Sequence, residues 1–148
     1  MTIKILVLII IIKRGGKGKM YPNKIATLVE NKQFSKAIDL LLNYLNKKPY
    51  DISAWCDIGY CFLNFGNYYE AIRYSKVALM LSNKKKETNI RPVIYLNLAQ
   101  AYKCSLNYKE AMDCIDEYFK LINDNDEDYQ QAIELKEQLK NKFQCTNI

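Results

Sequence analysis

An aromatic residue stands two or three positions before each of three alanines that open the second helix of a predicted hairpin, and these three alanines define a period. They are Ala37, Ala71 and Ala111, separated by 34 and 40 residues. Self-similarity at a spacing of about 20–50 residues is typical of repeat proteins. Because one short hairpin cannot bury its apolar stripe alone, the spacing predicts stacked units that share a continuous core.

Residues 55–83 show what one unit contains. A first apolar stripe at helical spacing comprises Trp55, Ile58, Gly59 and Phe62. Gly66 and Asn67 then interrupt the pattern, which predicts a turn. A second stripe follows on the other side of the turn, and it comprises Ala71, Tyr74, Val77, Ala78 and Leu81. The stretch therefore predicts two antiparallel helices that approach closely at Gly59 and Ala71.

This stretch resembles one tetratricopeptide repeat, and the likeness extends over about residues 20–143. The family's Trp-like position falls on Tyr21, Trp55, Tyr95 and Tyr129. Its Gly-like position falls on Ile25, Gly59, Ala99 and Ile133, and its late Ala-like position on Tyr44, Ala78 and Tyr118. The middle unit matches best and the first is degenerate. The resemblance implies an all-α fold, a right-handed α-α superhelix (α-solenoid) of antiparallel hairpins.

The expected domain covers residues 20–145. It comprises repeats at about residues 18–51, 52–85 and 92–125, and a capping helix at about residues 126–143. The polar residues 82–91 are expected to form a loop that absorbs the six-residue insertion. Asp51 or Ser53 is expected to cap the Trp55 helix, and Asp124 or Asp126 the last one. The other expected helices span about residues 21–31, 34–47, 68–81, 92–104 and 108–121.

Residues 1–19 differ from the rest of the chain. Ile3–Ile12 is apolar except for Lys4, and the basic, glycine-rich residues 13–19 follow. As a helix the apolar run spans about 15 Å, half the thickness of a bilayer core. We interpret residues 1–19 as residues upstream of a true start at Met20 or as a disordered tail. The alternatives are a short membrane anchor or signal and a folded segment.

Charge and residue usage argue against several classes of function. The net charge is +6, of which +5 belongs to residues 1–20. The predicted domain therefore has almost no excess of positive charge, which argues against binding of nucleic acid. The chain has no histidine, which excludes His-based acid–base catalysis and His metal ligation. Its five cysteines form no CxxC pair, and this favours reduced thiols in a cytoplasmic protein. We expect no enzyme activity, no cofactor and no metal.

In the family that the chain resembles, the first helix of each hairpin lines a concave groove that holds a peptide or a helix of a partner. The resemblance implies a scaffold or adaptor, with a membrane-tethered assembly factor anchored through residues 3–19 as the alternative. Some members of the family bind acidic chaperone tails through a clamp of Asn and basic residues. We do not expect this clamp here, because Asn97 is the only residue that matches it and Asp57 would repel a carboxylate. The groove residues carried over are Asp57, Tyr60, Asn64, Asn97, Gln100, Lys103, Gln131 and Glu134.

Overall fold

The computed structural model describes residues 23–126 and 128–146, and these residues form helices without any strand. Short connections join consecutive helices. The predicted all-α fold class is confirmed for this part of the chain. The helices are α2 (Asn23–Glu30), α3 (Phe34–Lys47), α4 (Ile52–Phe65), α5 (Tyr68–Lys85), α6 (Arg91–Cys104), α7 (Tyr108–Leu121) and α8 (Tyr129–Thr146).

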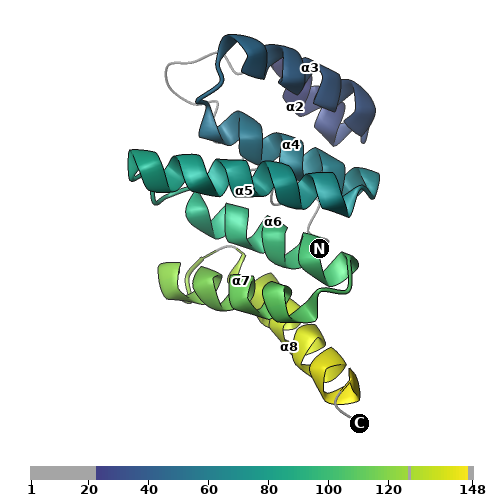
Figure 1. Cartoon of the computed structure of the whole chain (residues 1–148), viewed down its shortest axis with the longest axis vertical. Helices are drawn as coiled ribbons and strands as arrows, with labels where there is room; N and C mark the ends of the chain where they lie inside the picture. Colours follow the sequence, from purple (N-terminus) through teal and green to yellow (C-terminus); the bar gives the residue numbers. More distant parts are fainter. Residues whose placement is uncertain (1–22, 127, 147–148) are drawn as a thin grey trace.

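The helices lie one after another along the long axis of the molecule, from α2 and α3 at one end to α8 at the other (Figure 1). Three clusters of buried apolar residues connect them, each built by three consecutive helices. The first joins α2, α3 and α4, the second α4, α5 and α6, and the third α6, α7 and α8. Because α4 and α6 each contribute to two clusters, the core continues through the whole stack.

The turn inside each hairpin repeats the same backbone geometry. A residue in the left-handed region ends the first helix at Lys32 (φ 57°), Gly66 (φ 91°) and Leu106 (φ 65°). The next residue donates its backbone N–H across the helix end to a carbonyl five positions earlier, which is the usual closure for a left-handed helix end. The bonds are Gln33 N to Leu28 O at 2.8 Å, Asn67 N to Phe62 O at 3.0 Å and Asn107 N to Tyr102 O at 2.9 Å.

Small residues allow the helices of a hairpin to approach at the predicted places. Ala37, Ala71 and Ala111 are all fully or almost fully buried. A Cβ added at Gly59 would overlap Ser75 Oγ and lie 3.3 Å from the carbonyl oxygen of Ala71. The spacing of 34 and 40 residues read from the sequence is therefore also the spacing of buried alanines near the start of α3, α5 and α7.

A tyrosine at the late position of a unit fixes the start of the next one. The Tyr44 hydroxyl donates to Asp51 Oδ2 at 2.7 Å, and Asp51 Oδ1 accepts from the backbone N–H of Ala54 at 3.2 Å. Asp51 is thus the predicted N-cap of α4. The Tyr118 hydroxyl likewise donates to Asp126 Oδ1 at 3.0 Å. Hydrogen bonds from equivalent tyrosines therefore set how one hairpin follows another at both ends of the stack.

The structure corrects the predicted loop between the second and third units. Helix α5 continues to Lys85, four residues beyond the expected end, so the polar run from residue 82 begins as helix. Ser82 is buried and its hydroxyl donates to Leu79 O at 2.8 Å, which keeps this turn packed on the core. The last helix begins at Tyr129 and continues past the expected end at 143.

The tail predicted at residues 1–19 lies outside the described residues. Between residues 23 and 146, leaving out 127, no helix is both long and apolar enough to cross a membrane.

Candidate partner-binding surface

The residues predicted to line a groove on α4 differ in their access to solvent. Asn64 is half-buried, and its Nδ2 donates to Tyr60 O at 2.9 Å, so part of its amide is used within the helix. Tyr60 was predicted to line the groove, but it is only 2% exposed and belongs to the first core cluster. Asp57 is 9% exposed. This part of the predicted groove is closed to solvent.

Helix α6 places its predicted groove residues beside α4 and α8. Asn97 is 5% exposed, and its Nδ2 contacts Cys56 Sγ at 3.7 Å, which connects α6 to α4. Lys103 donates to Gln138 Oε1 and so connects α6 to α8. The inner sides of α4, α6 and α8 are therefore joined through polar side chains at or next to the predicted positions.

Two of the predicted residues carry buried polar atoms that lack a hydrogen-bond partner. They are Gln100 Oε1 on α6 and Gln131 Nε2 on α8. Gln100 Nε2 contacts Cys104 Sγ at 3.7 Å, so only the carbonyl oxygen of that amide is unsatisfied. Glu134, also predicted on α8, is exposed. One buried acceptor and one buried donor at this end of the stack thus have no hydrogen-bond partner.

Burial keeps a tyrosine and two cysteines around the site neutral. It raises the pKa of Tyr60 to about 12, and nearby charge on Cys61 and Asp57 acts in the same direction. Burial also raises the pKa of the Cys61 thiol, and it raises the pKa of Cys114 to about 12. Because the thiolate is the reactive form, these two thiols are unsuited to act as nucleophiles. All five cysteines lie among the described residues, and none of them is in a disulfide.

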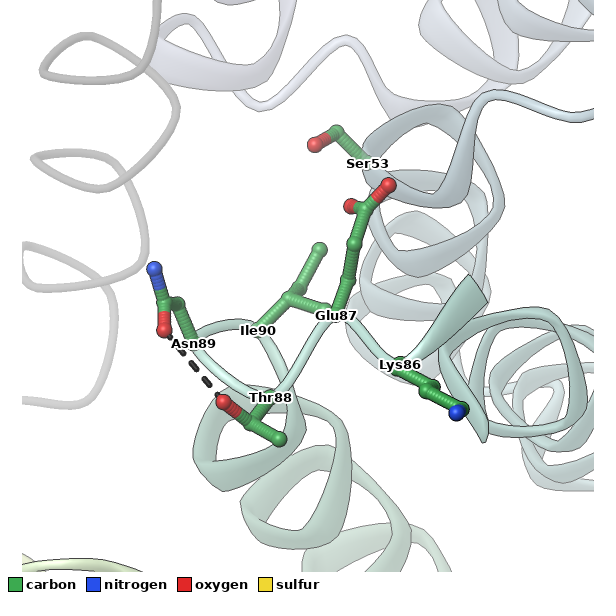
Figure 2. A pocket seen from close by; sticks show the side chains of 6 residues that line it. All are labelled: Ser53, Lys86, Glu87, Thr88, Asn89 and Ile90. Atoms are coloured by element: carbon green, nitrogen blue, oxygen red, sulfur yellow. Dashed lines mark hydrogen bonds between the residues drawn. The ribbon is translucent and has the colours of Figure 1, made fainter. Parts of the chain in front are cut away.

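A polar hollow of about 380 Å³ lies where the connection from α5 to α6 passes the first turn of α4 (Figure 2). Ser53 and Glu87 face each other across it, and Thr88 Oγ1 contacts Asn89 Oδ1 at 3.5 Å. Lys86, just after α5, and the buried Ile90 also line it. Sequence reasoning identified this stretch only as an insertion, because its residues share no recognisable ligand spacing.

No protein-family model matches the chain. The candidate surface is consequently defined by the chain's own geometry, in which α4, α6 and α8 all contribute to the buried clusters of one stack.

Proposed function

We propose that the chain is a tetratricopeptide-like scaffold that binds a peptide or helix of another protein along the inner sides of α4, α6 and α8. The support comes from geometry repeated at the sequence period. Left-handed turn residues and buried alanines recur at matching positions of the three units, and a hydrogen-bonded late tyrosine occurs in the first and third. Stacked helical hairpins present long continuous surfaces of the kind that hold extended partners. The unbridged cysteines fit action in the reducing cytoplasm.

The observation that carries this proposal is the pair of unsatisfied amide atoms at Gln100 and Gln131. A buried donor or acceptor without a partner costs about 1–3 kcal/mol, so a folded chain rarely keeps one without a reason. The main chain of a bound segment offers a C=O for Gln131 Nε2 and an N–H for Gln100 Oε1. Binding would thus offset the free energy that the two unpaired amide atoms cost the folded chain.

The charges at the surface restrict the partner's chemistry. Asp57 and Glu134 are acidic, while the ammonium of Lys103 already contacts Gln138. A carboxylate-rich peptide would meet repulsion at Asp57, whereas a cation or a neutral donor would be attracted. We therefore infer a partner segment that is neutral or basic along its contact side.

Capture of partners from native lysate by the tagged full chain tests the proposal. We expect the variant Gln100→Ala/Gln131→Ala to lose at least one partner that wild type enriches. Losing both amides should lower affinity at least about tenfold, because each hydrogen bond left unmade costs about 1–3 kcal/mol. Thermal unfolding of the variant should match or exceed wild type, because the substitutions remove unsatisfied polar atoms.

The matched control is Gln33→Ala/Gln144→Ala, which removes two exposed glutamine amides at a turn and near the end of α8. It should capture the same proteins as wild type. Equal capture by the Gln100/Gln131 variant and the control would refute the proposed surface.

A further inference from the structure

Cations gather where the last turn of α5 meets the connection from α3 to α4. Lys85 Nζ donates to the backbone oxygen of Tyr50 at 2.7 Å, and the ammonium of Lys48 lies 6.0 Å from the centre of the Tyr44 ring. The first of these contacts joins two basic runs that are far apart in the sequence. We call the resulting group the basic end, and it comprises Lys47, Lys48, Tyr50, Lys84, Lys85 and Lys86.

The positive charge of the basic end is not neutralised by the fold. All five lysines are exposed, and within residues 23–126 and 128–146 none of them forms an ion pair. The neighbouring acids are directed elsewhere. Asp51 accepts from the Tyr44 hydroxyl and the N–H of Ala54, and Glu87 faces Ser53 across the hollow of Figure 2. Because like charges repel, this grouping favours the binding of an anionic partner.

The shape of the basic end restricts what that partner can be. Helix α5 has 18 residues and its neighbours α4 and α6 have 14, so its last turn projects beyond them on this side of the stack (Figure 1). Residues 83–89 are all exposed. A projecting end has no walls to enclose an acidic peptide or a nucleic acid strand, but it can bring several cations against a flat surface.

We infer that the basic end docks the protein on an anionic bilayer surface. A cluster of about four to eight lysines is the usual size of a site that binds anionic headgroups. Tyr50 is 65% exposed, and tyrosine is enriched at the level of the headgroups, where its ring is apolar and its hydroxyl stays in water. The residues of the basic end differ from those of the surface under Proposed function.

The position of the charges matters more here than their number. Residues 1–20 carry +5 of the net charge of +6, so the rest of the chain has a net charge of only +1. A general attraction between the domain and a bilayer is therefore weak. Moving the same number of charges away from the basic end should abolish docking, and this allows a control of equal net charge.

Sedimentation of the full chain with vesicles tests the inference without any partner protein. We expect binding to vesicles of phosphatidylcholine mixed with phosphatidylserine, and much weaker binding to phosphatidylcholine alone. The variant Lys84→Gln/Lys85→Gln/Lys86→Gln should lower the partition coefficient about a hundredfold, because each lysine close to an anionic surface contributes about fivefold. Replacing the same three lysines by arginine keeps the charge and should keep the binding.

The matched control is Lys32→Gln/Lys36→Gln/Lys140→Gln, which loses the same charge from exposed positions away from the basic end. It should bind the mixed vesicles like wild type. Circular dichroism of each variant should show wild-type helix content at the temperature of the assay, so that a loss of binding reports on the charges and not on unfolding.

Three results would overturn the inference. An equal loss in both glutamine variants would assign the binding to net charge, and no loss in either would assign it to another part of the chain. Tighter binding of wild type to polyglutamate or single-stranded RNA than to the mixed vesicles, lost in the Lys84/Lys85/Lys86 variant, would identify a protein or nucleic acid as the partner. None of these results involves Gln100 or Gln131, so they leave the proposed function untouched.

Discussion

The crossing of α4 over α5 at Gly59 makes a quantitative prediction for Gly59→Ala. The added Cβ would overlap Ser75 Oγ and lie 3.2 Å from Ser75 N and 3.3 Å from Ala71 O. The hydroxyl can rotate, but the two backbone atoms can move only if α5 shifts. Overpacking of this kind costs about 1–3 kcal/mol, while replacing glycine by alanine inside a helix returns about 0.5–1 kcal/mol. We expect a net loss of about 1–2 kcal/mol.

Unfolding followed by circular dichroism measures this loss. For a domain of this size it corresponds to a melting temperature lower by about 3–10 °C. Adding Ser75→Ala removes the overlapping oxygen, so the double variant should be more stable than the sum of the two single changes predicts. An unchanged or higher melting temperature for Gly59→Ala would refute the close crossing, because helix propensity alone would then decide the outcome.

Three further changes test the remaining interactions. Leu106 is 70% exposed and has a left-handed backbone, so Leu106→Gly should relieve about 1–2 kcal/mol of strain. Glycine also stabilises the unfolded chain through its entropy by roughly 0.5–1 kcal/mol, which leaves a net gain in stability of about 0.5–1 kcal/mol. Urea unfolding measures this gain, and a loss of stability would contradict the assigned strain. Ala71→Leu should cost about 1–3 kcal/mol by overpacking, and a variant that melts within a degree of wild type would count against the register. Burial, and after it the hydrogen bond to Asp51, raises the pKa of Tyr44 from 10.0 to about 12. The neutral phenol therefore stabilises the fold below pH 10, and this contribution is lost between pH 10 and 12. Urea titrations at pH 9 and pH 11 should therefore show a smaller fall in stability for Tyr44→Phe than for wild type, and equal falls would argue against the bond.

Helix positions followed from the sequence wherever apolar spacing and a helix breaker agreed. The expected bounds 34–47 and 108–121 are those of α3 and α7, because each has a strong apolar stripe and a clear boundary. Helix α5 was predicted too short, because Ser82 and the lysines after it were interpreted as loop residues. The structure buries Ser82, and Lys84 and Lys85 lie in the last turn, where cations stabilise a helix end. Polarity alone therefore does not separate a solvated helix end from a loop.

The candidate surface was less predictable than the helices. The register correctly indicated which side of α4 faces α5, but it gave no information on what lies against the opposite side. Tyr60 was accordingly predicted to line the groove, and the structure buries it. The unsatisfied atoms of Gln100 and Gln131 depend on how α8 meets α6, and no pattern within one helix specifies that contact.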